Sequence, residues 1–255
     1  MKRMPVVFAG HGSPMNIVEQ NQFTRGWAAM AEALPKPEAI LCVSAHWFGP
    51  WDAVSETGTP ETIHDFYGFP EELYAVQYPA PGAPDLARRT VSLMGPGTEA
   101  DSRRGLDHGA WSVLHCMYPG ADIPVCQLSV NAGNSPMESY LAGQKLSPLR
   151  EEGVLILGSG NIVHNLSLVD WNRSGGYPWA DEFDGYIRAA VEEGRYDAAV
   201  NYDAAGPSAR RAFSSRDHYD PLLYTLGAAD SGDPVRIFNS ERVMGSLSMT
   251  SYIIG

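Results

Sequence analysis

Short runs of apolar and β-branched residues recur along the chain, and longer segments between them have apolar residues at every third or fourth position. The short runs predict strands, and several contain almost no polar position, as expected for strands buried on both faces. The longer segments have the period of amphipathic helices. Predicted strands cover residues 5–10, 39–45, 52–58, 123–130, 153–160, 234–239 and 245–254, and predicted helices cover 22–34, 84–94, 109–118, 137–152 and 179–194.

The alternation of strands and helices predicts a single α/β domain over residues 1–255, a sandwich in which helices flank a mainly parallel or mixed central sheet. The last strand, 245–254, alternates polar and apolar positions, which is typical of an antiparallel edge strand. Two irregular segments, 60–84 and 165–179, are rich in aromatic residues. Such segments usually lie over the carboxyl ends of strands, so we expect the functional site at that edge of the sheet.

Charge and cysteine content narrow the class of protein. The 18 basic and 30 acidic residues give a net charge of −12. An acidic surface repels phosphate groups, so neither nucleic acid nor an anionic membrane is an expected partner. No uninterrupted apolar stretch is long enough to span a membrane. The three cysteines form no CxxC pair and lie among apolar residues, which predicts reduced thiols in a cytoplasmic protein.

Histidines follow several of the predicted strands. His11 and His46 come directly after the first two strands, and His164 follows the fifth by a few residues. Because the carboxyl ends of parallel strands meet at one edge, these imidazoles should converge, and His108 and His218 could reach the same edge from predicted helix starts. Converging imidazoles indicate a metal site. The alternative for each single histidine is an ordinary hydrogen-bonded residue.

Motifs for other chemistries are weak. The segment GSGNIV has two glycines of a dinucleotide-binding fingerprint, but Val163 stands in place of the third. The segment GHGSPM contains Ser13 without the flanking glycines of a GxSxG nucleophile motif. The acidic residues show no spacing typical of a phosphotransfer site.

Seven segments together resemble the class III extradiol ring-cleavage dioxygenases, and in particular the 4,5-DOPA extradiol dioxygenase subgroup. They are GHGSPMN, SAHWF, TIHDFYGFPEELYAVQYPAPG, LDHGAWSVL, GSGNIVHNL, HYDPLLYTLGA and MGSLSM, in this order and over nearly the whole chain. The resemblance implies one α/β domain, a non-haem metal, and O2-dependent opening of a catechol ring to give a muconic semialdehyde.

The resemblance also implies a role for each of five histidines. His11, His46 and His218 match metal ligands, His164 matches an acid–base catalyst or a fourth ligand, and His108 matches a second active-site histidine. Related branches have a carboxylate as the third ligand. Fe2+ is the implied metal, and three neutral imidazoles also suit Zn2+.

The expected substrate contacts are Ser13, His64, Phe66 and Tyr67, with the aromatic 60–84 segment as an apolar wall. Ordinary packing of a long loop is the alternative for this segment, and a hydrogen bond within its own loop is the alternative for His64. Carboxylates stand beside three of the histidines in the sequence and could orient imidazoles, although sequence neighbours often point apart. They are Asp65, Asp107 and Asp217.

Three functions stay open at this point. A catechol dioxygenase has a small-molecule catechol and O2 as its partners. A zinc-dependent hydrolase would use zinc-bound water on the same three histidines and would need no O2. A non-catalytic metal-binding protein would keep the fold without turnover. The sequence does not decide which catechol is used, whether cleavage is 4,5 or 2,3, or whether the chain is a monomer or a small homo-oligomer.

Overall fold

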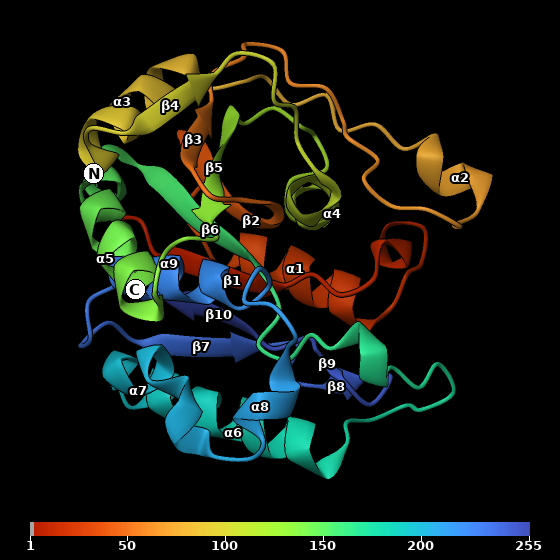
Figure 1. Cartoon of the computed structure of the whole chain (residues 1–255). Coiled ribbons are helices and arrows are strands. Elements are labelled where there is room, and N and C mark those ends of the chain that lie inside the picture. The colour runs from red at the N-terminus through yellow and green to blue at the C-terminus, as the bar shows by residue number, and fades with distance from the viewer. Residues whose placement is uncertain (1–2) are drawn as a thin grey trace.

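The computed structural model describes residues 3–255, and its centre is one mixed sheet of eight strands (Figure 1). The strand order is β4-β3-β5-β2-β6-β1-β10-β7. The four central strands β5, β2, β6 and β1 are parallel, so their carboxyl ends share one edge. The strands are β1 (Val6–Gly10), β2 (Ala39–Gly49), β3 (Asp52–Ser55), β4 (Thr98–Asp101), β5 (Val125–Asn131), β6 (Val154–Gly160), β7 (Val235–Phe238) and β10 (Ser251–Ile254), with a separate pair of β8 (Arg242–Val243) and β9 (Leu247–Ser248).

Helices cover both faces of this sheet (Figure 1), and each face has its own hydrophobic core. Val6 and Phe8 of β1 pack into one core, and Val7 and Ala9 pack into the other, as alternating side chains of a central strand must. The predicted α/β sandwich is therefore confirmed. The helices are α1 (Gln22–Glu32), α2 (Glu71–Tyr74), α3 (Pro84–Met94), α4 (His108–Met117), α5 (Pro136–Leu146), α6 (Pro178–Glu192), α7 (Tyr196–Val200), α8 (Ala209–Ala212) and α9 (Asp220–Ala228), and 3-10 turns cover Pro14–Ile17, Ser147–Glu152, Leu166–Leu168 and Tyr202–Ala205.

Several elements differ from the sequence-based prediction: β2 extends to Gly49, β3 ends at Ser55, and the strand predicted over 245–254 is divided into β9 and β10. The helix expected over 137–152 is α-helical only to Leu146 and continues as a 3-10 turn. Pro148 lacks a backbone N–H and disfavours the α conformation before it, which explains the early end. The C-terminal strand β10 is antiparallel as expected, but it lies between β1 and β7 and is not an edge strand.

The polar positions of β10 explain why its alternation was misleading. The Ser251 hydroxyl accepts a hydrogen bond from Gly10 N–H and donates one to the Met249 carbonyl oxygen, both at 3.0 Å. A serine whose hydroxyl group forms hydrogen bonds with the backbone can be buried. From the sequence alone, such a serine cannot be distinguished from one that faces the solvent.

No helix among residues 3–255 is long and apolar enough to cross a membrane. The cytoplasmic location expected from the sequence stays a prediction.

Helix α9 packs closely against α5. His218 lies two residues before the start of α9, so this contact also positions His218. A Cβ atom placed on Gly143 of α5 would lie 2.1 Å from the Tyr224 carbonyl oxygen of α9. Real Cβ contacts are never this short, so the two helices can approach this closely only because residue 143 has no side chain.

We expect Gly143→Ala to lower the free energy of unfolding by about 1–3 kcal/mol, because the added methyl group must push α9 away from α5. Gly185→Ala is the matched control: Gly185 is also within a helix, α6, and a Cβ there meets no atom within 4 Å. This control should be neutral or more stable by about 0.5–1 kcal/mol. Urea unfolding of both variants measures the difference, and equal stabilities would contradict the packing argument.

Candidate metal and catalytic site

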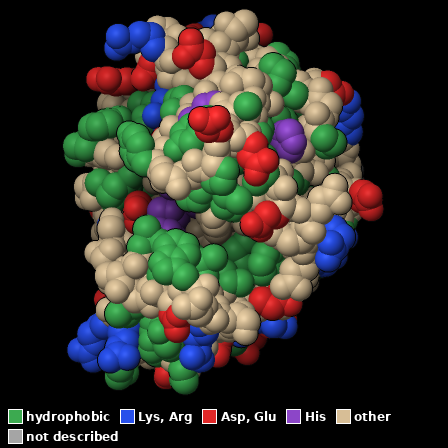
Figure 2. Space-filling model, turned by 90° about the vertical axis from the view of Figure 1, so that its right-hand side faces the viewer, with side chains coloured by type: hydrophobic (Ala, Val, Ile, Leu, Met, Phe, Trp, Pro, Cys, Tyr) green, Lys and Arg blue, Asp and Glu red, His purple; other side chains and the backbone are tan. Residues whose placement is uncertain are grey.

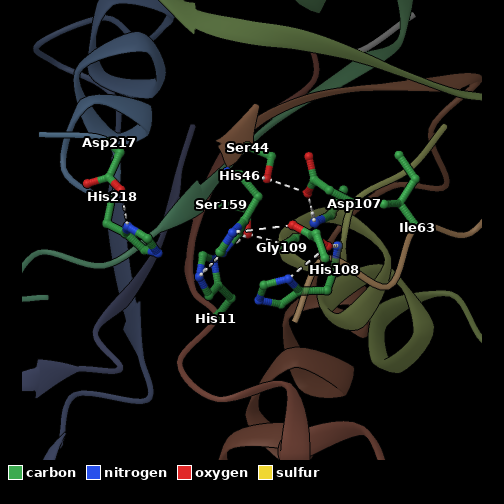
Figure 3. Close-up of polar contacts among 12 residues, drawn as sticks. His11, Ser44, His46, Ile63, Asp107, His108, Gly109, Ser159, Asp217 and His218 are labelled. Atoms are coloured by element: carbon green, nitrogen blue, oxygen red, sulfur yellow. Dashed lines mark hydrogen bonds and ion pairs between the residues drawn. The ribbon is translucent and has the colours of Figure 1, made fainter. Parts of the chain in front are cut away.

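His11 lies immediately after β1, at the carboxyl edge of the sheet. Its N–H donates to the Gly160 carbonyl oxygen at 3.1 Å, which continues the pairing of β1 with β6. Its Nδ1 atom lies 3.0 Å from the Ser159 hydroxyl oxygen, and that hydroxyl donates to the Gly109 carbonyl at 2.5 Å (Figure 3). Since the Ser159 proton is already used, Nδ1 of His11 must be the donor. Its Nε2 atom therefore keeps a free lone pair.

His46 lies inside β2 rather than after it, because the strand continues to Gly49. The pairing of β2 with β5 shifts between Val43 and Phe48, and such irregularities re-aim side chains next to active sites. The His46 ring reaches the site by passing close to Gly109, where a Cβ would lie 2.7 Å from the His46 Cδ2 atom. Its Nε2 atom lies 3.2 Å from Nε2 of His11.

His218 reaches the same place from the other face of the sheet, just before α9. Its carbonyl oxygen accepts a hydrogen bond from Asn161 N–H at 2.8 Å. A Cβ atom placed on Gly160 would lie 2.2 Å from this oxygen. Gly160 therefore allows this segment to pack on the end of β6. The His218 Nδ1 atom lies 3.1 Å from a carboxylate oxygen of Asp217.

These three imidazoles form one group. One ring nitrogen from each of His11, His46 and His218 lies within 4.8 Å of the other two. Burial lowers the pKa of His11 and His218 well below the usual value, and burial together with His108 lowers the pKa of His46 to about 4. The rings are therefore neutral at pH 7, the form in which histidine binds metals. Nδ1 of His11 is hydrogen-bonded to Ser159, and Nδ1 of His46 and of His218 lies 3.4 and 3.1 Å from a carboxylate oxygen, so the donor set fits a divalent metal held by one nitrogen of each ring.

Two further imidazoles border this group. The His164 ring stacks on the His218 ring, with centroids 3.5 Å apart and planes 4° from parallel. Burial lowers the pKa of His164 to about 4. His108 begins α4, and its ring centroid lies 3.8 Å from that of His46. The convergence of five histidines expected at this edge is thus observed.

Asp65 joins His108 to His46. One carboxylate oxygen accepts hydrogen bonds from His108 N–H at 2.9 Å and from Nδ1 at 3.0 Å, and the other lies 3.4 Å from Nδ1 of His46. Burial favours the neutral acid, but the hydrogen bonds and charge of His108 outweigh it and lower the pKa of Asp65 to about 2. The carboxylate is therefore ionised and orients both rings.

The other two aspartates have different partners. Asp217 is beside its neighbour His218, as described above. Asp107 contacts no imidazole: its carboxylate accepts hydrogen bonds from Ser44, Gln127 and Arg104 at 2.6, 2.7 and 2.8 Å. Asp107 also caps the start of α4, and so it positions His108 through the helix rather than through its ring.

The histidines open into a cavity of about 370 Å³. Figure 2 shows histidine side chains at a recess bordered by hydrophobic side chains. Both irregular segments line the cavity. Segment 60–84 contributes Phe66 and Phe69, and segment 165–179 contributes Leu166 and Trp171. This agrees with their predicted position over the strand ends. The remaining lining residues are the five histidines of the cluster, Gly12, Ser13, Pro14, Asp217, Met244 and Leu247.

The expected substrate contacts divide into two groups. Ser13 and Phe66 line the cavity, whereas His64 and Tyr67 are not among its lining residues. The His64 Nε2 atom donates to the Val76 carbonyl oxygen of its own loop at 2.9 Å. The Tyr67 side chain is 91% exposed. Substrate contact by these two residues is therefore not supported by the geometry.

Sequence reasoning missed Ser159, which fixes the orientation of His11. It lies in the GSG segment, where the glycines suggested only a weak nucleotide motif. It also assigned no role to Met244 and Leu247, which bring the C-terminal segment to the cavity. The quoted MGSLSM segment was a signal for this region, but its apolar residues resemble ordinary core residues.

Imidazoles that could hold a metal ion at the carboxyl edge of an α/β sheet are typical of a metal-dependent enzyme. The chain belongs to the family described as the catalytic LigB subunit of aromatic ring-opening dioxygenase, which matches residues 4–254. The predicted family and enzyme class, an oxidoreductase that opens aromatic rings, are confirmed. The family implies a non-haem metal, which the histidine group fits.

Individual proteins resemble the chain over nearly its full length. A protein of Escherichia coli K12 named 4,5-DOPA dioxygenase extradiol is 46% identical over 260 residues, covering 99% of this chain and 95% of that protein. A Beta vulgaris protein of the same name is 38% identical, covering 96% and 94%. The crystal structure of an uncharacterized protein from Escherichia coli K12 has a TM-score of 0.86 and 41% identity, covering 99% of this chain and all of that one.

We expect Asp65→Asn to weaken metal binding by about tenfold to 100-fold, because the variant loses the charge that orients His46 and His108. Competition with a chromogenic chelator measures the affinity for Zn2+. Asp85→Asn is the control, since the Asp85 side chain is 97% exposed and belongs to α3. Unchanged zinc affinity in Asp65→Asn would show that this carboxylate does not support the metal site.

Proposed function

We propose that this protein opens the ring of a catechol beside its two hydroxyl groups, with O2 as co-substrate, and releases a muconic semialdehyde. The observation that carries the proposal is the group of three neutral imidazoles that lines an apolar cavity, in a chain of the aromatic ring-opening dioxygenase family. We further propose that residues 1–255 form one catalytic domain. The oligomeric state, monomer or small homo-oligomer, stays a prediction.

We propose that His11, His46 and His218 hold Fe2+ through their Nε2 atoms. When bound there, Fe2+ supplies the redox chemistry needed for O2 and lowers the pKa of the catechol hydroxyl groups. The same three nitrogens also suit Zn2+, which has no redox chemistry. Zinc in this site would therefore give a protein that binds catechols without opening them.

His164 is the proposed general base. Its imidazole is neutral at pH 7, lies against His218 and lines the cavity, so it can accept a proton from a catechol hydroxyl group. Two groups of ligating atoms lie within 4.8 Å of one another, His11, His46 and His218 in one and His46, Asp65 and His108 in the other, and neither contains His164. This supports the role of acid–base catalyst over that of fourth ligand.

His108 is the proposed second catalytic histidine. Because its Nδ1–H donates to the ionised Asp65, the Nε2 atom is the one available to the substrate or oxygen. His108 is therefore oriented so that Nε2 is the atom through which it can exchange a proton with the substrate or oxygen.

The substrate ring is proposed to lie against Phe66 and Phe69, which exclude water from one side of the cavity. Ser13, which directly precedes the 3-10 turn Pro14–Ile17, also lines the cavity. Its hydroxyl oxygen accepts a hydrogen bond from Met15 N–H at 3.2 Å, which leaves the hydroxyl proton to donate to a bound catechol. The names of the Escherichia coli and Beta vulgaris relatives support a DOPA-like catechol as the substrate.

We expect oxygen uptake when L-DOPA is added to protein that has been stripped of metal and reloaded anaerobically with Fe2+. An oxygen electrode measures the uptake, and absorbance of the ring-opened semialdehyde identifies the product. The zinc-loaded protein is the control and should consume no oxygen, because Zn2+ cannot be oxidised. If fully iron-loaded protein consumes no oxygen with L-DOPA or simple catechols, a zinc-dependent hydrolase or non-catalytic metal protein becomes the better interpretation.

Replacement of single histidines should separate ligands from catalysts. His11→Ala and His46→Ala should lose the metal, whereas His164→Ala should keep most of it and lose about 10²–10⁴-fold in turnover. Metal content by mass spectrometry and oxygen uptake are measured together. His115→Ala, which removes a half-buried histidine on α4 outside the cavity, is the control for loss of an imidazole. Loss of metal from His164→Ala would make that residue a ligand.

A further inference from the structure

A second chamber adjoins the catalytic cavity. It has a volume of about 310 Å³ and shares Ser13, Phe69, Trp171, Met244 and Leu247 with that cavity. Its other lining residues come from the 3-10 turn after His11, the start of α1, and the β8–β9 region: Met15, Asn16, Glu19, Asn21, Phe23, Val243 and Met249. We call it the side-chain chamber, because a substituent on a ring held at the histidines could extend into it.

The two amides of the side-chain chamber are already committed to the fold. The Asn16 amide donates to the His11 carbonyl oxygen at 3.1 Å and accepts from the Asn21 amide at 2.8 Å. The Asn21 side-chain oxygen accepts from Phe23 N–H and Thr24 N–H at 2.9 and 3.1 Å, which caps α1. The Asn21 amide has no donor or acceptor left for a ligand, and the buried Asn16 amide keeps one N–H and one lone pair but carries no charge.

Glu19 is the charged residue that remains. Its exposed carboxylate lines the side-chain chamber and accepts one hydrogen bond, from the Asn21 amide at 3.3 Å, so it retains acceptor capacity. The catalytic cavity adds a second carboxylate, Asp217. Among the residues that line these two chambers, no lysine or arginine occurs.

This arrangement matches one kind of substituent. An ammonium group has three donors and no acceptor, which complements a free carboxylate, whereas a substituent carboxylate would find no cation on the chamber walls. Trp171 and Phe69 add aromatic side chains, which attract ammonium groups. The net charge of −12 also favours the approach of cations over anions.

We propose that the side-chain chamber receives the ring substituent and selects catechols whose substituent carries an ammonium group, with Glu19 as its partner. The inference rests on the proposed catechol ring opening and adds the class of substituent. Dopamine carries such a group alone, L-DOPA carries it together with a carboxylate, and their analogues without nitrogen lack it.

Two matched pairs of catechols isolate the ammonium group. L-DOPA differs from 3-(3,4-dihydroxyphenyl)propionate, and dopamine differs from 4-ethylcatechol, only by the amino group. We expect kcat/KM of the iron-loaded protein to favour the amine in both pairs by about two- to fivefold, the size of one solvent-accessible ion pair. Glu19→Gln should bring both ratios close to one. Glu32→Gln, an exposed glutamate of α1 outside both chambers, should keep the ratios of the unmodified protein.

Calorimetric binding of the same four catechols to zinc-loaded protein separates this inference from ring opening itself. A two- to fivefold affinity preference for the amines that disappears in Glu19→Gln would support the proposed role of the side-chain chamber. If the iron-loaded protein then opens none of the rings, only the proposal of ring opening is contradicted. Equal affinities within each pair, or a preference that persists in Glu19→Gln, would overturn the assignment whether or not the rings are opened.

Discussion

Five imidazoles that lie against one another can share a site only if most of them stay uncharged. Removal from water achieves this here, because burial is the largest cause of the lowered pKa of His11, His46, His164 and His218. Each neutral ring has one donor and one acceptor nitrogen, so its orientation depends on where the donor is used. The Ser159 hydroxyl takes the Nδ1 donor of His11, so the Nε2 lone pair of that ring is left for a metal.

The approach of the rings also requires small residues at particular backbone positions. Gly109 leaves room for the His46 ring, and Gly160 leaves room for the carbonyl group of His218. These glycines lie in a helix and at a strand end, where side chains would ordinarily be compatible with the backbone. Because these two residues have no Cβ atom, α4 and the segment before α9 can pack closely against the sheet. The histidine group and this packing therefore depend on each other.

The sequence was sufficient for the α/β sandwich, since buried parallel strands and amphipathic helices have distinct periods. It also placed His11 and His164 after strands, which is enough to predict convergence at one edge. It could not place His46 within an irregular part of β2, because a shift in pairing depends on the neighbouring strand. It could not identify Ser159 as the partner of His11, since their 3.0 Å contact joins adjacent strands far apart in the chain.

The two parts of the binding region have different structural origins. The histidines of the metal group are fixed by strand ends, a strand irregularity and the start of α9, all of which are tied into the central sheet. The proposed substrate side includes Phe69, Trp171 and Glu19, which lie in connecting segments. Connecting segments can change in sequence without altering the sheet, whereas the strand ends cannot. The fold thus allows the class of ring substituent to vary while the ring-opening site is kept, and in this chain an acidic, cation-free chamber favours an ammonium group.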